Sequence, residues 1–358
     1  MFINATLHKT SAVVMTICTL LLCAGALIYS KECSGGAVRG IEMCLGVLVP
    51  SLFPFMALSA FIVKSGMSET LGKPFKWIMN KLFGLDSCFA PIILLALIGG
   101  YPVGAKGISS LYESRMISEH QAKKVSMFAV CSGPGFLINF VGMSIYKNKL
   151  IGFIILVSQI VSVILIGVIL NLFDREKEVH NSSEENKACR LPLSNAVVES
   201  AYDSAKGILN ICIFVVLFSA FCGILESIIG DGIFKNCLLC FLEVCSAIST
   251  CSESCPIEMI AFAAGFGGLC VHFQIYSALG KIRINKLLFF CIRIIQGVLT
   301  AVLTHFGLRM LKIEAMVFST GAVENASTSG GTILSGAVLV LVMLCFLYIL
   351  SHRRMRNL

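Results

Sequence analysis

The stretch AVCSGPGFLINF, residues 129–140, lies in the middle of an apolar run long enough to cross a membrane. Its Gly133-Pro134-Gly135 core is poor chemistry for an unbroken helix, because proline lacks the backbone N–H and glycine adds conformational freedom. A break at bilayer depth leaves backbone groups without partners, at a cost of several kcal/mol each. It is tolerated where it is buried in protein or lines a watery cavity. The stretch therefore predicts a break that serves a site.

The composition around this stretch is that of a membrane protein. The chain has 358 residues, of which 57% are hydrophobic and 13% charged, with a mean hydropathy of +0.89. Soluble domains carry about 25% charged residues. Two apolar runs, residues 88–104 and 234–249, are too short or too broken to span comfortably. Runs of spanning length recur at residues 11–30, 41–63, 125–146, 150–173, 208–226, 257–279, 287–306 and 333–350.

Several function classes find no support in the sequence. The net charge of +8 comes from Lys and Arg scattered between apolar runs, which indicates membrane topology rather than nucleic-acid binding. Most of the 17 cysteines lie inside these runs, where Cys behaves as a small apolar residue. We find no motif of a nucleophilic, phosphate-binding or zinc enzyme. We therefore expect no catalytic residue, no metal site, no cofactor and no nucleic-acid partner.

The sequence contains a weak internal repeat, as many transporters do. Residues 132–140 (SGPGFLINF) match residues 266–274 (FGGLCVHFQ), and residues 147–170 match residues 281–304, without a gap. Each half then reads as a helix, a short broken segment, a Gly-broken helix and a long helix. The predicted fold class is an all-α polytopic membrane protein. It has two repeats, each with a short re-entrant segment, and extra N- and C-terminal helices.

The Lys and Arg residues between the spans predict how the repeats are oriented. With the C-terminal HRRMR inside and both short segments re-entrant, most of these residues fall on the cytoplasmic side. The repeats then enter the membrane from opposite sides and are inverted, with both termini cytoplasmic. The expected division is an N-terminal helix and loop, a first repeat, a cytoplasmic linker, a second repeat and a C-terminal helix with a basic tail: residues 1–38, 39–173, 174–206, 207–308 and 309–358.

Inverted repeats bring two helix breaks together near the bilayer midplane. Each half-helix N-terminus there offers free N–H donors and about half a positive charge, which suits an anion or a polar ring. We therefore predict one solute site between the breaks; close helix packing at the glycines is the alternative. The residues of the two breaks are Ser132, Gly133 and Pro134 in the first half and Gly267 and Gly268 in the second.

Polar side chains near the same places complete the predicted substrate-binding set. Pro50 and Pro54 predict a kinked helix that lines the same pathway. For one of these side chains, His272, a role in helix packing is the alternative. The polar side chains next to the breaks are Tyr101, Asn139, His272 and Gln274.

Arg293 falls inside the expected span 287–306, and the repeat pairs it with Gln159. A guanidinium inside a membrane is costly and needs a partner, so it indicates function. We expect it to bind the solute, to form a salt bridge with Glu243, or both. The solute reading predicts that Arg293→Gln abolishes uptake and leaves membrane abundance intact.

At these residues the chain resembles a known family. VPSLFPFMALSAF (residues 49–61), GGYPVGAK (99–106), CSGPGF (131–136) and GFGGLCVHFQ (265–274) are similar to the YlbJ type of sporulation integral membrane proteins. The resemblance covers roughly residues 39–306. It implies two nucleoside-recognition (gate) domains, distantly similar to the concentrative nucleoside transporters. The chain departs from the pattern at Gly135-Phe136, where Leu-Phe is usual.

The resemblance implies a role in endospore formation, in the cell membrane or outer forespore membrane of a spore-forming bacterium. The implied activity is import of dipicolinate, a small flat dianion, into the developing spore. A nucleoside or other small-solute carrier is the alternative within this class. A non-transporting membrane scaffold or signalling component of sporulation is the alternative from another class. The expected partners are an anionic or aromatic small molecule and the lipid bilayer, and the sequence leaves a homo-oligomer open.

Overall fold

A computed structural model of the chain describes residues 16, 20, 22–174, 191–251 and 255–311. These residues form helices and connecting turns, with no strand among them, which confirms the all-α prediction for this part of the chain. The last expected span, residues 333–350, and the basic tail lie outside the described residues. Residues 11–15, 17–19 and 21 of the first expected span, 11–30, also lie outside them.

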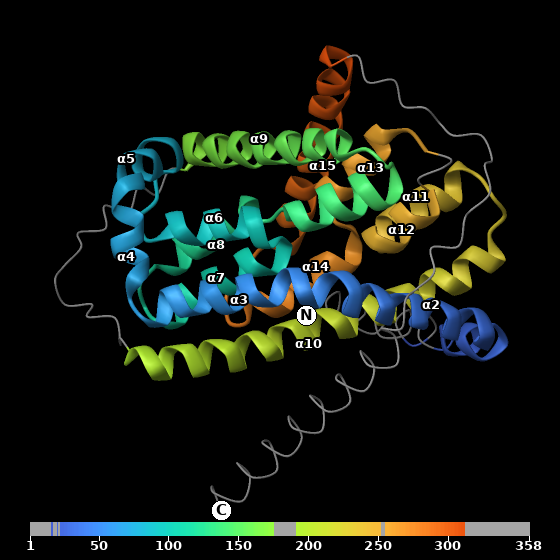
Figure 1. Cartoon of the computed structure of the whole chain (residues 1–358), viewed down its shortest axis with the longest axis horizontal. Helices are drawn as coiled ribbons and strands as arrows, with labels where there is room; N and C mark the ends of the chain where they lie inside the picture. Colours follow the sequence, from blue (N-terminus) through green and yellow to red (C-terminus); the bar gives the residue numbers. More distant parts are fainter. Residues whose placement is uncertain (1–15, 17–19, 21, 175–190, 252–254, 312–358) are drawn as a thin grey trace, which may run out of the picture. The chain divides into compact units, whose positions relative to one another are not determined.

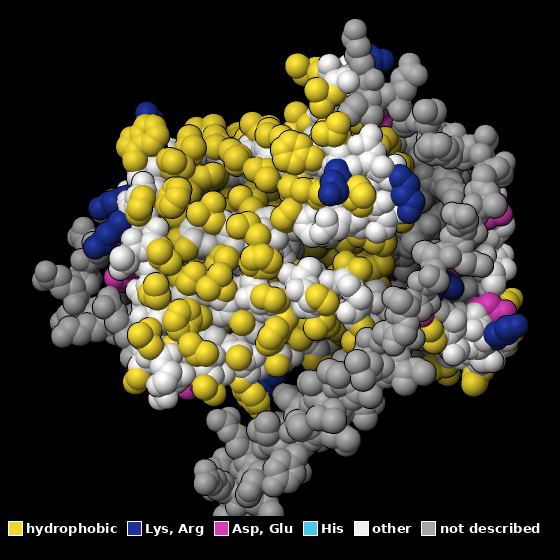
Figure 2. Space-filling view, in the orientation of Figure 1, with side chains coloured by type: hydrophobic (Ala, Val, Ile, Leu, Met, Phe, Trp, Pro, Cys, Tyr) yellow, Lys and Arg dark blue, Asp and Glu magenta, His cyan; other side chains and the backbone are white. Residues whose placement is uncertain are grey.

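Long apolar helices confirm the polytopic membrane architecture. Leu, Ile, Val and Phe side chains are exposed along three of them, and Figure 2 shows a face on which hydrophobic side chains far outnumber charged ones. Such a surface is stable against lipid rather than water. Five helical segments are long and apolar enough to span: Ser30–Lys64, α9 (Lys149–Phe173), α10 (Leu193–Ile228), Ile257–Leu279 and α15 (Lys286–Met310).

Three of the expected boundaries fall inside helices, at 38/39, at 206/207 and, within α15, at 308/309. Helix α2 (Ser30–Met43) continues through the wider turns of η1 (Cys44–Leu48) into α3 (Val49–Lys64), so no loop separates the N-terminal segment from the first repeat. Helix α10 begins inside the expected linker 174–206 and packs along α2 and α3 (Figure 1). Lys64 pairs there with Asp203 at 2.5 Å. Two charges of the expected linker, Glu199 and Asp203, are thus ion-paired with Lys64 and lie on a helix longer than the apolar stretch.

After α3 come four short helices, α4 (Met67–Gly72), η2 (Lys73–Phe75), α5 (Lys76–Ile78) and η3 (Met79–Phe83). Four interruptions divide the other short helices of the described residues into pairs. They include both breaks that the glycines predicted, at Gly133 and at Gly267. The pairs are α6 (Phe89–Gly99) and α7 (Tyr101–Glu113), broken at Gly100; α8 (Glu119–Phe128) and η4 (Gly135–Ile145), broken over residues 129–134; α11 (Ile233–Leu242) and α12 (Val244–Cys251), broken at Glu243; and α13 (Ile257–Phe266) and α14 (Gly268–Leu279), broken at Gly267.

The same order of elements occurs twice. In both halves a long helix precedes a short interrupted pair, a second interrupted pair and a helix of 25 residues, which is α9 in the first half and α15 in the second. In the first half, α4, η2, α5 and η3 come between the long helix and the first pair. Each 25-residue helix has an asparagine N-cap: Asn148 Oδ1 accepts from Leu150 N at 3.0 Å, and Asn285 Oδ1 accepts from Leu287 N at 3.1 Å. These caps set the correspondence between the two halves.

With the caps superposed, Gln159 corresponds to Gln296, not to Arg293 as the ungapped sequence match suggested. Each glutamine lies eleven residues after its capping asparagine. The expected pairing was wrong by three residues, because an apolar helical pattern matched without gaps can slip by about one turn of 3.6 residues.

The interrupted helices are packed inside the long ones. Helix α15 contacts α9 and α13, α7 contacts α3 and α14, and α10 contacts α14. The largest fully buried side chains include Phe89, Phe128, Phe266 and Phe289 together with Arg293. An arginine among phenylalanines is the exception in this core, and it lies beside two of the breaks.

Candidate functional site

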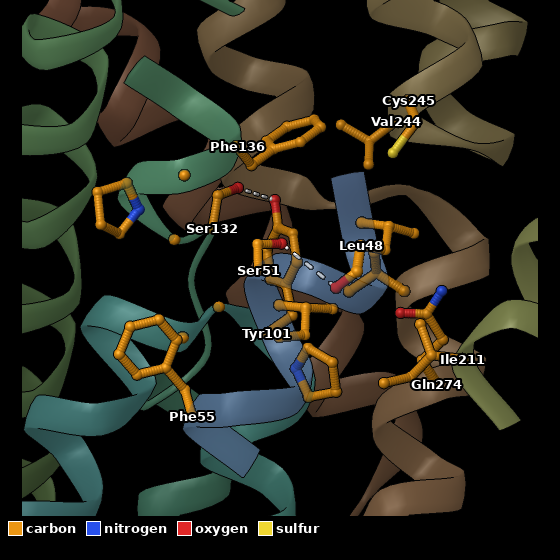
Figure 3. Close-up of a pocket in the computed structure, with 18 of the residues that line it drawn as sticks. Leu48, Ser51, Phe55, Tyr101, Ser132, Phe136, Ile211, Val244, Cys245 and Gln274 are labelled. Carbon is orange, nitrogen blue, oxygen red and sulfur yellow. Dashed lines mark hydrogen bonds between the residues drawn. The ribbon is translucent and has the colours of Figure 1, made fainter. Parts of the chain in front are cut away.

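A cavity of about 350 Å³ lies where three of the interruptions meet. Residues at Gly100, over 129–134 and at Glu243 form part of its wall, and α3, α10 and α14 supply the rest (Figure 3). The volume suits a small organic solute, since ligand pockets run from roughly 300 to 1,000 Å³. Helices α7, η4 and α12 all begin at this wall.

Most of the predicted site residues meet at this cavity. Gly267, Gly268, His272 and Arg293 are not part of its wall. Gly267 and Gly268 of the second break are therefore not part of the cavity wall, whereas Ser132, Gly133 and Pro134 of the first break are. The predicted residues that do line the cavity are Tyr101, Ser132, Gly133, Pro134, Asn139, Glu243 and Gln274.

Two hydroxyl groups tie the cavity wall to the second half. Ser132 Oγ donates to the phenol oxygen of Tyr101, and Tyr101 Oη donates to the carbonyl oxygen of Ala264, in the last turn before the Gly267 break. Figure 3 shows the Ser132–Tyr101 bond at the wall. A solute that bonds to either hydroxyl competes with a bond that joins the two halves.

Arg293 satisfies the backbone carbonyls that both breaks leave free. It is 0% exposed. Its Nε donates to Phe266 O at 3.2 Å and its Nη1 to Val130 O at 2.6 Å, and Nη2 donates to Gly265 O. A buried charge with this many acceptors is a structural clamp, because each carbonyl would otherwise be unsatisfied in an apolar surrounding. Arg293 does not line the cavity, and its predicted role in binding solute stays a prediction.

The two corresponding glutamines make a reciprocal clamp. Gln159 on α9 donates from Nε2 to Ala264 O at 2.8 Å, and Gln296 on α15 donates from Nε2 to Val130 O at 3.1 Å. Each half thus satisfies a carbonyl at the break of the other half. Gln159 also accepts from Ser132 N at 3.0 Å. Polar residues inside the core hold the irregular backbone together, as a bilayer requires.

Glu243 lies at the break between α11 and α12 and is 1% exposed. Its carboxylate accepts from Cys245 N at 2.9 Å and Ser246 N at 2.5 Å, which caps the N-terminus of α12. The expected salt bridge with Arg293 was wrong, since in the described structure each group bonds to backbone instead. Glu243 also lines the cavity, so its carboxylate is part of the cavity wall.

His272 packs among aromatic rings behind the cavity. Its Nδ1 lies 2.7 Å from Gly268 O, and its ring lies within about 6 Å of Phe266, Phe289 and Phe290. This is the helix-packing role that stood as the alternative for this residue. Its neighbour Gln274, two residues on, does line the cavity (Figure 3).

The apolar part of the wall includes residues that sequence reasoning did not select. Ser51 and Phe55 lie on α3 and line the cavity, whereas the flanking Pro50 and Pro54 do not. The prolines in VPSLFPF had indicated that this helix lines the pathway, although the prolines themselves are not in the wall. Ile211 and Val215 of α10 also line the cavity, and no signal marks them because they are ordinary apolar positions of a spanning helix.

The charge of the wall differs from the expectation. Among the described residues that line the cavity there is no Lys, Arg or His, and the carboxylate of Glu243 is the charged group. The N-terminus of α12 is neutralised by that carboxylate. The N-termini of α7 and η4 carry no side-chain cap and face the cavity with their partial positive charge.

Fold and cavity together define a class. The chain is a multi-pass α-helical membrane protein with a solute-sized cavity built at helix interruptions.

A curated relative supports the family resemblance. The sporulation integral membrane protein YlbJ of Bacillus subtilis (strain 168) is 21% identical over 336 residues, which cover 83% of this chain and 82% of the relative. This similarity supports the resemblance of the chain to the YlbJ type of sporulation integral membrane proteins. No protein-family profile and no solved structure matches the chain.

Proposed function

We propose that the protein is a transporter that moves a small polar solute through this cavity during endospore formation. The observation that carries the proposal is the cavity of about 350 Å³ at the meeting point of three helix interruptions, lined by most of the predicted site residues. Irregular backbone at membrane depth is costly and is a feature of transporter sites. The relative's role in sporulation supplies the cellular context.

The repeated order of helices supports an alternating-access mechanism. We propose that the two halves are inverted repeats, with α6–α7 and α11–α12 as re-entrant pairs and both termini cytoplasmic. The reciprocal bonds of Gln159 and Gln296 would lie on the pseudo-symmetry axis. Rocking of one half against the other would expose the cavity to each side in turn. The resemblance implies that these halves are gate domains.

Dipicolinate is the first solute to test, because the resemblance implies it. In this proposal its flat ring lies between Tyr101 and the apolar residues of α3 and α10 that line the cavity. Its two carboxylates would lie at the uncapped N-termini of α7 and η4, which favour negative charge. The basic side chain expected beside them is not in the wall, so the dianion would depend on backbone donors.

A nucleoside is the second solute to test, and the charge of the wall favours it. Hydroxyl, amide and carboxylate groups from Tyr101, Asn139, Gln274 and Glu243 suit the hydroxyls and amide edges of a neutral ring system. A carboxylate repels a dianion and accepts hydrogen bonds from a neutral sugar.

The experiment is dipicolinate content by compartment in sporulating cells that lack the gene. Mother cells that still make dipicolinate while the spores stay empty support the transport step. Normal filling of spores contradicts dipicolinate as solute. Uptake of labelled dipicolinate and labelled uridine by proteoliposomes of the full chain then separates the two solutes. A purified, folded protein that moves neither favours the scaffold or signalling role.

A further inference from the structure

Glu243 stands apart from the other polar groups of the cavity wall because no basic side chain of the described residues pairs with its carboxylate. It is 1% exposed, and its hydrogen bonds come from Cys245 N and Ser246 N. An ionised carboxylate inside a membrane protein is costly and is paired or marks an ion pathway. The capping bonds offset part of that cost. They do not supply a positive charge of full magnitude.

The titratable groups near Glu243 in the described structure are cysteine thiols. Those that interact with it electrostatically come from four elements: Cys44 on η1, Cys222 on α10, Cys245 on α12 and Cys270 on α14. Arg39 and Glu226 also interact electrostatically with Cys222. These two residues pair with each other, with Arg39 Nη2 and Glu226 Oε2 2.7 Å apart, so Arg39 does not neutralise Glu243. Arg293 bonds to carbonyls elsewhere. In the described structure, the negative charge of Glu243 is therefore left for a small cation to neutralise.

Protonation of Glu243 changes the wall of the cavity. A carboxylate accepts on both oxygens, whereas a protonated carboxyl has one oxygen that is a donor. The two N–H bonds at 2.9 and 2.5 Å require both oxygens as acceptors, so adding a proton weakens one of them. The residues at that end of α12, Val244 and Cys245, line the cavity (Figure 3). Proton binding and solute binding therefore act on the same end of one helix.

We propose that Glu243 is the proton-binding residue of this protein and couples solute movement to a proton gradient. The inference rests on the proposed transport function and adds the driving ion. A proton from one side neutralises the carboxylate and loosens the cap of α12 while solute is bound. It leaves to the other side when the carboxylate recaps the helix. One proton is taken up and one released in each cycle, and the protein is unchanged.

Proteoliposomes of the full chain test the coupling with labelled dipicolinate and labelled uridine as probes. With one proton per solute, a pH gradient of one unit drives accumulation by up to about tenfold. We expect Glu243→Gln to lose accumulation and to keep exchange of internal for external solute near the wild-type rate. The matched control is Glu226→Gln, whose carboxylate pairs with Arg39, and it should keep gradient-driven accumulation. Loss of coupling with retained exchange is not expected from a merely structural residue.

Two transport results would overturn the proposal and leave the transport function standing. One is a Glu243→Gln protein that accumulates solute in a pH gradient like the wild type. The other is a wild-type protein driven by a sodium gradient and indifferent to a pH gradient.

Infrared difference spectra of the wild-type protein test proton binding without transport. Acidification should give the carbonyl band of a buried protonated carboxyl, and Glu243→Gln should lack it. If Glu243→Gln protein does not fold, Glu243→Asp keeps a titratable group and should shift the band. No band in the wild type sinks the proton site. A band without uptake of either probe means that the transport proposal fails while the proton site stands.

Discussion

The break at residues 129–134 and the break at Gly267 both leave backbone groups without helical partners, and the two breaks satisfy these groups in different ways. The first is six residues long, and Ser132, Gly133 and Pro134 line the cavity. The second is a single residue with φ +87°, and the carbonyls before it are covered by Arg293. Both are held by a glutamine from the other half. The comparison teaches that a break can line a cavity or be covered by a buried arginine, and under the proposed function the first break is the site and the second is its anchor.

The two breaks differ because the matching positions of α15 and α9 carry different residues, Arg293 and Leu156. Arg293 lies three residues before Gln296 on α15, and the position three residues before Gln159 on α9 is Leu156. Arg293 donates to the carbonyls of Phe266 and Gly265 at the second break and to the carbonyl of Val130 at the first break. A leucine offers no such donor, and Ser132, Gly133 and Pro134 of the first break line the cavity.

The largest effect is expected from Arg293→Met, which removes the anchor. Three backbone carbonyls lose a charged donor in an apolar surrounding, and we expect a destabilisation of about 3–5 kcal/mol. Thermal unfolding in detergent and abundance in membranes measure it. Arg39→Met is the control, since this partly exposed pair with Glu226 is worth no more than about 1 kcal/mol. An Arg293 variant with normal abundance and lost uptake would support the predicted role in solute binding.

Gly133→Ala should distort the first break, which lines the cavity. A Cβ there would lie 2.6 Å from Ile98 O, which is backbone and cannot move away cheaply. We expect a cost of about 1–3 kcal/mol and a loss of solute binding as the break is pushed apart. Solute-induced thermal stabilisation, with dipicolinate and uridine as probes, measures the binding. Binding unchanged from wild type would place the site elsewhere.

Gln159→Leu sharpens the comparison by removing the reciprocal clamp from one half. It leaves Ala264 O with fewer donors and Ser132 N without Gln159 Oε1, for an expected loss of about 1–3 kcal/mol. Gln296→Leu is the matched variant. Because Arg293 also donates to Val130 O, the loss at Gln296 should be smaller in the same unfolding assay. Equal losses would mean that Arg293 does not reinforce the second clamp.

Gly267→Ala should have the smallest effect on solute binding. The alanine would hold φ +87° at a cost of about 1–2 kcal/mol, and its Cβ would meet the Val271 side chain at 3.1 Å. We expect the melting temperature to fall while the binding of both probe solutes persists. A variant that folds but no longer binds solute would show that the second break belongs to the site after all.

The sequence by itself determined the membrane class and the places where helices break. Both follow from local chemistry: long apolar runs are stable only against lipid, and Gly133-Pro134 and Gly267-Gly268 disfavour continuous helix wherever they occur. The polar side chains Tyr101, Asn139 and Gln274 were found because they follow such breaks closely. Nearness in the chain was enough for these residues.

Only the tertiary structure decided which of these groups face the cavity. Arg293 and Glu243 both looked like site residues, yet the register of α15 turns the arginine onto carbonyls while the break before α12 brings the glutamate to the wall. Ile211 and Val215 join the wall because α10 packs against the interrupted helices. The rotation of one helix against another depends on side chains far apart in sequence, which no local pattern records.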